Sequence, residues 1–183
     1  MKTLAEKLIF TYDDIERLPE GNYEIMDGER YDMTPASFEH GDLEGKFYKL
    51  LTRHLESKGH IAVGEVGVLI SKKPLKIRAA DVVYISREKS PERPTGILEI
   101  PPDLIIEIIS ESNTAWEITD KVKDYLLIGV ERIILIEPKT KTASLYQKGK
   151  REALLYDYED EIVVLEGLTL RLKDLVPSST LTQ

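Results

Sequence analysis

The sequence predicts a mixed α/β fold, in which a central sheet is flanked by helices, and three observations support this prediction. Residues 104–109 form an almost continuous apolar run, which is typical of a central strand covered on both faces. A segment with apolar residues at helical spacing follows at 113–128, between a Ser/Thr/Asn-rich start and Gly129. Residues 132–136 then return as a second buried run. This order predicts a β-α-β unit with two parallel strands.

The other predicted elements surround this unit. The longest helix is expected over residues 38–58, where five apolar residues recur at helical spacing before Gly59. Shorter helical segments are expected at 12–18 and 172–176. The remaining predicted strands are short runs rich in β-branched and aromatic residues, bounded by turn residues: 23–26, 31–33, 61–70, 79–85, 143–147, 153–158 and 162–165.

Length and composition predict one globular domain over residues 1–183, with a core at about 10–150 and a strand meander with a short helix at 151–176. The chain has no cysteine, which excludes disulfides, thiolate metal sites and cysteine nucleophiles. No apolar run reaches the roughly 18 residues that a membrane span needs. The first residues lack the apolar stretch of a signal peptide. We therefore expect a cytoplasmic protein.

The charge balance limits the classes of function that fit the chain. The chain carries 25 Lys and Arg against 33 Asp and Glu, a net charge of −8. This sign disfavours a protein that coats nucleic acid by charge alone. Residues 72–78 nevertheless hold four basic side chains just before Asp81. They form either a solvated hairpin or a local attraction for phosphate.

Glu107 is the strongest anomaly in the sequence, because it interrupts the aliphatic run at 104–109. Desolvating a carboxylate costs several kcal/mol in effective terms, so such a group usually has a partner. Asp81 stands against a second apolar run, 82–85. If the two strands are neighbours, the carboxylates converge, and paired carboxylates favour a bound cation such as Mg²⁺. A capping role for Asp81 and a satisfied structural role for Glu107 remain the alternatives.

Lys121 follows on the next predicted helix. Glu117, Lys121 and Tyr125 share one stripe of this helix beside its apolar face, which aims Lys121 toward the sheet. On spacing alone, an ordinary surface Glu–Lys pair is the better explanation of Lys121.

Several segments in a fixed order give the chain a resemblance to a known family: Tyr23–Glu29, Met33–Pro35 with His40, Asp81–Val83, Asp103–Ser112, Asp120–Tyr125, Gly129–Glu131 and Ile136–Pro138. Together they resemble the Uma-two family of endonucleases, which belongs to the PD-(D/E)xK restriction-endonuclease-like superfamily. The resemblance spans residues 10–150. It implies a four- or five-stranded mixed sheet between helices that holds one or two Mg²⁺ ions, with Mn²⁺ as an alternative ion. Asp81 and Glu107 would be the metal ligands.

The chain departs from the superfamily motif at two positions. Ala80 stands where the motif has proline, and Ile109 stands where it has lysine. In the Uma-two pattern the lysine lies on the following helix, and Lys121 occupies that place. The resemblance therefore implies that Asp81, Glu107 and Lys121 are the catalytic residues. His40 also matches a family histidine and is an additional candidate for the site, with a structural role as the alternative. Glu44, one helical turn later, is a further candidate carboxylate near the metal, and Glu24 matches the family's early glutamate with a structural role.

These observations predict a Mg²⁺-dependent endonuclease that cleaves phosphodiester bonds, with DNA as the expected partner, no membrane association and a homodimer as the expected assembly. The alternative is a nuclease-fold module for nucleic-acid binding or assembly with little hydrolytic activity, which Ile109 and the acidic net charge favour. A glycosidase with paired carboxylates is disfavoured, because the chain has one tryptophan, Trp116, to form an aromatic sugar platform.

Overall fold

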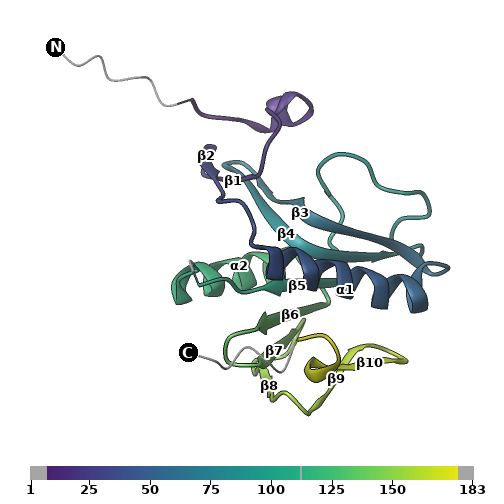
Figure 1. Ribbon diagram of the computed structural model, residues 1–183. Helices are drawn as coiled ribbons and strands as arrows, with labels where there is room; N and C mark the ends of the chain where they lie inside the picture. The colour runs from purple at the N-terminus through teal and green to yellow at the C-terminus, as the bar shows by residue number, and fades with distance from the viewer. Residues whose placement is uncertain (1–7, 112, 177–183) are drawn as a thin grey trace.

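The computed structural model describes residues 8–111 and 113–176, which form a mixed eight-stranded sheet, a smaller two-stranded sheet and helices on both sides (Figure 1). The strands are β1 (Tyr23–Met26), β2 (Glu29–Asp32), β3 (Gly59–Lys72), β4 (Leu75–Ser86), β5 (Leu104–Ile108), β6 (Arg132–Glu137), β7 (Thr142–Gln147), β8 (Leu154–Tyr156), β9 (Glu161–Leu165) and β10 (Leu168–Arg171). The helices are α1 (Phe38–Leu55), α2 (Ala115–Ile128) and the 3₁₀ turns η1 (Tyr12–Arg17) and η2 (Leu172–Asp174).

Strand β4 organises the large sheet. The strand order is β2-β1-β4-β5-β6-β7-β8, and β3 pairs with β4 outside this path. Strand β3 pairs with β4 along one edge of β4. The other edge of β4 pairs with β1 at Ile77 and with β5 from Val82 to Tyr84. Between these two contacts lies the stretch of β4 that carries Asp81. Strands β5 and β6 are parallel, as the β-α-β pattern predicts.

The two α-helices cover opposite faces of the sheet. Helix α1 buries Leu43, Phe47, Leu51 and Leu55, which recur at helical spacing and pack with residues of β4, β5 and β6. The small sheet and η2 join this core. Helix α2 packs on the other face through Val122 and Tyr125. In the described part of the chain, no helix has the length and apolar character that crossing a membrane requires.

Helix α2 has the boundaries that its sequence signals indicate. Thr114 caps its N-terminus by accepting a hydrogen bond from the Glu117 backbone N–H, and the Glu117 side chain completes a capping box. Gly129 ends the helix with a left-handed φ of 95°, which glycine adopts without strain. These caps fix the rotation and start of the helix that carries Lys121.

Some boundaries differ from the sequence prediction. Helix α1 ends at Leu55, and Gly59 is the first residue of β3. A Cβ at position 59 would lie 2.3 Å from the Ile85 carbonyl oxygen, so this position requires glycine. Strand β4 begins at Leu75, so most of the basic run is paired strand and only Lys73-Pro74 turns. The eight-stranded sheet exceeds the four or five strands that the resemblance implies. The meander contains an additional strand, β10.

Candidate functional site

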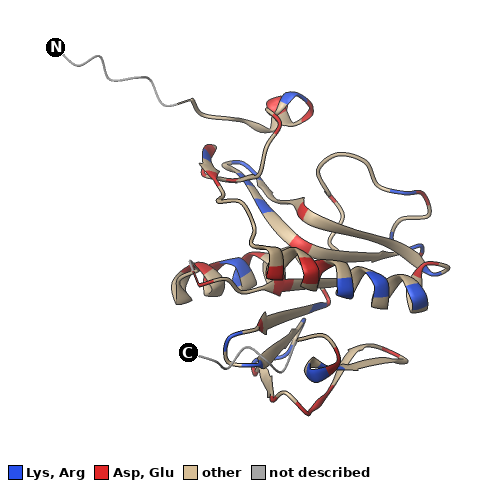
Figure 2. Cartoon of the chain, viewed as in Figure 1, with Lys and Arg blue, Asp and Glu red and all other residues tan. Residues whose placement is uncertain are grey.

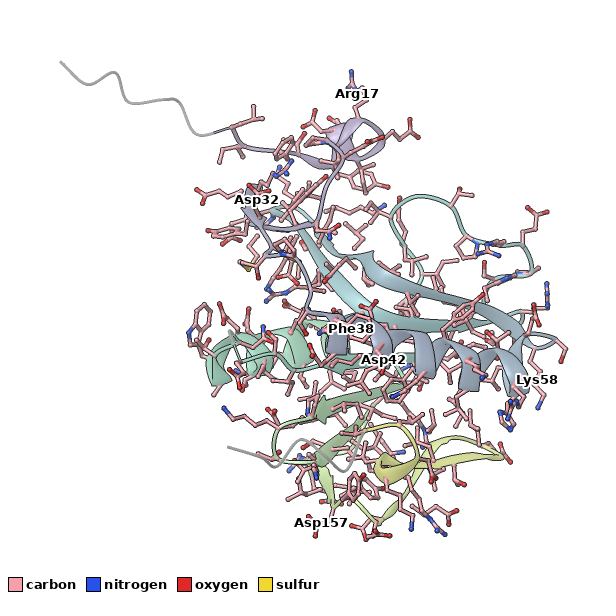
Figure 3. All side chains as sticks on the ribbon, in the orientation of Figure 1. Arg17, Asp32, Phe38, Asp42, Lys58 and Asp157 are labelled. Atoms are coloured by element: carbon pink, nitrogen blue, oxygen red, sulfur yellow. The ribbon has the colours of Figure 1, made fainter. Side chains whose placement is uncertain are left out.

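A large cleft of about 930 Å³ opens between the β1–β2 hairpin, the start of α1 and the first turns of α2. Asp32, labelled in Figure 3, lies on its lining together with residues of the segment that leads into α1. Four of the five side chains that the sequence predicts for the site line this cleft: His40, Asp81, Glu107 and Lys121. The fifth, Glu44, lies one helical turn beyond His40.

Asp81 and Glu107 lie on paired strands. The antiparallel register pairs Val82 with Ile106 and ends there, one residue short of Asp81 on β4 and one residue short of Glu107 on β5. Both residues are almost fully buried, and Asp81 Oδ2 accepts a hydrogen bond of 2.6 Å from the Ile108 backbone N–H. Both carboxylates line the cleft, and the nearby charge of Asp81 is one of the causes that raise the pKa of Glu107.

Lys121 reaches this pair from α2. Its Nζ donates to Glu107 Oε2 at 2.8 Å, and the Tyr125 hydroxyl donates to Glu107 Oε1 at 2.7 Å. Burial raises the pKa of Glu107 to about 8, against the opposing effect of Lys121. Burial also acts to lower the pKa of Lys121, but the carboxylates of Glu107, Glu24 and Asp81 outweigh it and raise the pKa. Lys121 is therefore a largely buried, charged ammonium rather than one side of a surface pair.

A second group of ion pairs, between β1, β4 and α2, holds Lys121 in position. Glu24 on β1 lies 3.4 Å from Lys121 Nζ through Oε1, and its Oε2 accepts a hydrogen bond of 2.7 Å from Arg78 Nη1. The buried Arg78 also donates from Nε to Asp124 Oδ2 at 2.6 Å and pairs with Asp120. Asp120 and Asp124 flank Lys121 on α2, so this network fixes the helix against β4.

His40 and Glu44 approach Asp81 from α1. His40 Nε2 lies 3.4 Å from Asp81 Oδ1 and 3.4 Å from Glu44 Oε1. Neither contact has hydrogen-bond geometry, so this buried nitrogen has no hydrogen-bond partner. The nearby Asp81 carboxylate is the largest influence on the pKa of His40 and raises it, whereas burial raises the pKa of Glu44.

Glu65 is a member of the site that the sequence analysis does not identify. Gly64 and Glu65 form a β-bulge in β3, between Val63 paired with Val82 and Val66 paired with Ala80, so two residues oppose Asp81 alone. Both have positive φ, 88° and 59°. An isolated glycine in a strand pattern signals such a bulge. Burial and the nearby Asp81 raise the pKa of Glu65 to about 7.

The bulge completes a donor set that fits a metal ion. One ligand atom each from His40, Glu65 and Asp81 lie within 4.8 Å of one another. Glu65 Oε2 and His40 Nε2 are both buried without a hydrogen-bond partner, and a cation would satisfy both atoms. Glu107 is outside this group, and its two oxygens accept hydrogen bonds from Lys121 and Tyr125. Carboxylate oxygens suit Mg²⁺ and Mn²⁺, and the imidazole favours transition metals.

Comparison with known proteins gives this site a family context. The family model named Uma2, described as "Putative restriction endonuclease", matches residues 11–182. The chain belongs to the Uma2 family. This confirms the resemblance drawn from the sequence, over a longer segment of the chain. No curated protein matches the sequence.

One solved structure shares the fold of this Uma2 protein. It is described as "a putative nuclease belonging to DUF820" from Anabaena variabilis. The TM-score is 0.77 at 20% sequence identity, and the match covers 91% of this chain and 97% of that chain. At this identity the likeness concerns the fold, and it confirms the predicted mixed α/β architecture.

Proposed function

We propose that this Uma2-family chain is a nuclease that hydrolyses phosphodiester bonds in DNA with the help of Mg²⁺ or Mn²⁺. One observation carries the proposal. The Lys121 ammonium lies 2.8 Å from Glu107 Oε2, and Asp81 Oδ2 accepts a hydrogen bond from the backbone N–H of Ile108, the residue after Glu107. A lysine and two carboxylates from three separate segments thus meet at one cleft, as metal-assisted phosphodiester hydrolysis requires. The family description supports the same reaction class.

The metal would be held at Asp81, with His40 and Glu65 completing the donor set and Glu107 as the further carboxylate that the resemblance implies. When bound, the cation lowers the pKa of a coordinated water and offsets negative charge that builds on the phosphate. Its own charge also favours the ionised forms of Glu65 and Glu107, whose pKa values burial otherwise raises.

The protein's own contribution is electrostatic and positional. Lys121 keeps its proton because three carboxylates raise its pKa, so it presents a fixed positive charge to the scissile phosphate and a donor to the attacking water. Glu107 and Glu24 hold the ammonium in place from two sides. Tyr125 orients the Glu107 carboxylate.

A non-catalytic nucleic-acid module is the second candidate, and Ile109 favours it because that position carries lysine in the superfamily motif. Lys121 on α2 brings an ammonium to within 2.8 Å of Glu107, so the lack of a lysine at position 109 does not leave the site without one.

Cleavage of plasmid and oligonucleotide DNA by the parent, Asp81→Asn and Lys121→Met, with Mg²⁺, Mn²⁺ or EDTA, separates the two candidates. We expect metal-dependent cleavage by the parent and losses of about 100-fold or more in each variant, which is the usual cost of removing one electrostatic contact to a transition state. The matched control is Lys123→Met, since Lys123 is exposed on the same helix. A parent that binds DNA but cleaves with neither ion would identify the module instead.

A further inference from the structure

The outer face of α1 is exposed and unusual in composition. Phe38 is 85% exposed and Tyr48 is 43% exposed, although both are large aromatic residues. Gly41 and Gly45 lie between them, and a Cβ built on either glycine would meet no described atom within 4 Å. The buried residues of α1 face the sheet on the other side of the helix. Packing within the described chain therefore gives no reason for aromatic side chains and two glycines on this face.

Charges on the same outer side are separated along the helix. Glu39 and Asp42 lie in the N-terminal half, and Lys49 and Arg53 lie in the C-terminal half, visible as red and then blue bands on α1 in Figure 2. Figure 3 marks the N-terminal half by Phe38 and Asp42 and the opposite end by Lys58. Asp42 pairs with Lys46 one turn away. Glu39, Lys49 and Arg53 form no ion pair with any residue that the structure describes.

We propose that α1 packs antiparallel against α1 of a second copy of this chain, about a two-fold axis near Gly45. An isologous pairing brings the acidic half of each helix beside the basic half of the other. If Asp42 faces Lys49 of the second copy, the midpoint falls between Gly45 and Lys46. If Glu39 faces Arg53 of the second copy, the midpoint falls at Lys46. Both charge pairs can therefore form about one axis, which lies within one residue of Gly45.

The glycines and aromatic residues fit the same axis. Gly45 lies within about one residue of this axis, and its missing side chain permits an interaxial distance near the short end of the usual 8–10 Å. Tyr48 then lies near the crossing and Phe38 beside the C-terminal half of the second helix, so both lose exposed apolar surface on pairing. A nucleic acid is a poorer occupant of this face, because the phosphates would meet Glu39 and Asp42.

The pairing leaves the candidate active site accessible. His40 contacts Asp81 on β4 and Glu44 on α1 from the sheet-facing side of the helix, away from the proposed interface. A single pair of helices about 27 Å long buries less surface than a standard stable interface of about 1,200–2,000 Å². We therefore expect a concentration-dependent dimer.

Charge reversal tests the register. Sedimentation velocity of the full chain at low and high micromolar concentration is expected to show a monomer–dimer equilibrium. Glu39→Lys and Arg53→Glu should each raise the dimer dissociation constant about tenfold, and the double variant should restore it. Lys150→Glu, an exposed residue of the β7–β8 connection, is the control and should change nothing. A monomeric parent, or a double variant as weak as the singles, overturns the proposal.

Cysteine crosslinking tests the axis itself. The chain contains no cysteine, so Gly45→Cys introduces a single thiol that lies beside its own counterpart across the two-fold axis. Mild oxidation should convert most of this variant to a covalent dimer, whereas Lys150→Cys should remain monomeric. Equal crosslinking of the two variants, or none at Gly45→Cys, contradicts the pairing. Both readouts measure assembly, so they are independent of whether the chain cleaves DNA.

Discussion

At the scale of single residues, Glu65 has two features that each lower the stability of the folded chain. Its φ of 59° is strained for a residue with a Cβ, and its Oε2 is buried without a hydrogen-bond partner. Glu65→Gly relieves both, so we expect its thermal unfolding midpoint without metal to rise by a few degrees. Calorimetric titration should meanwhile show Mn²⁺ binding weakened at least about tenfold, since one ligand is lost.

Glu65→Gln is the matched control, because it keeps the backbone strain and the shape but loses the charge. It should weaken Mn²⁺ binding without the full gain in stability. Unchanged Mn²⁺ affinity in both variants would remove Glu65 from the ligand set.

Tyr125 carries a second prediction at this scale. Its hydroxyl is one of two donors to the buried Glu107 carboxylate. Tyr125→Phe leaves Glu107 Oε1 without that donor, so urea unfolding should show a loss of about 1–3 kcal/mol. Tyr48→Phe, on the exposed side of α1, is the control and should lose almost nothing. A Tyr125→Phe variant as stable as the parent would mean that water replaces the hydroxyl.

The residues that sequence alone could predict are those whose burial is improbable. Asp81 and Glu107 stand out because each is a carboxylate next to an aliphatic run, and desolvation makes such a placement costly. Lys121 needed the family resemblance, since its spacing fits a surface pair equally well. Glu65 was missed because it lies in a bulge, where the two-residue alternation of a strand no longer tells which face a side chain occupies.

At the scale of elements, the ion pairs between β4 and α2 hold the helix that carries Lys121 in place against the sheet. Arg78 contacts Glu24, Asp120 and Asp124, and Lys76 adds a contact of 2.7 Å to Asp124 Oδ1. Arg78→Met removes the buried guanidinium and leaves Lys121 and Lys76 as the remaining partners of Glu24 and Asp124, so we expect a loss of about 3 kcal/mol in the free energy of unfolding.

The same variant should lower metal-dependent cleavage, because Glu24 and α2 no longer hold the ammonium at Glu107. Urea unfolding and cleavage assays measure the two effects. Arg151→Met removes an exposed arginine and serves as the control. Cleavage at the parent rate by a destabilised Arg78→Met protein would limit this network to a structural role.

Local sequence signals predicted the bounds of some helices and strands better than those of others. Helix α2 and its flanking strands follow from caps and apolar runs that are local in the chain. Strand β4 was underestimated at its start, because Lys76 and Arg78 look like solvent-exposed charges, yet their partners lie on α2, more than 40 residues away. Contacts at such separation leave no periodic signal in the strand itself.

At the scale of the whole molecule, the raised pKa values link stability, pH and metal. Burial raises the pKa of Glu65 to about 7 in the folded chain, against 4.5 for the unfolded reference, and shifts the pKa of Glu107 in the same direction. The folded state therefore binds more protons over this range, and the free energy of unfolding falls as pH rises. The raised pKa of His40 acts in the same direction. Carboxyls with lowered pKa, such as Glu117, act only at lower pH.

Thermal unfolding should therefore have a lower midpoint at about pH 8 than at about pH 5.5 without metal. Divalent ions compete with the protons on the same carboxylates, so Mn²⁺ should raise the midpoint more at the higher pH. Glu65→Gln should flatten both trends, because it removes one of the titrating groups. A metal-free midpoint that rises between these two pH values, or equal stabilisation by Mn²⁺ at both, would show that these carboxylates are ionised without a cation and that the cluster does not exchange protons for metal.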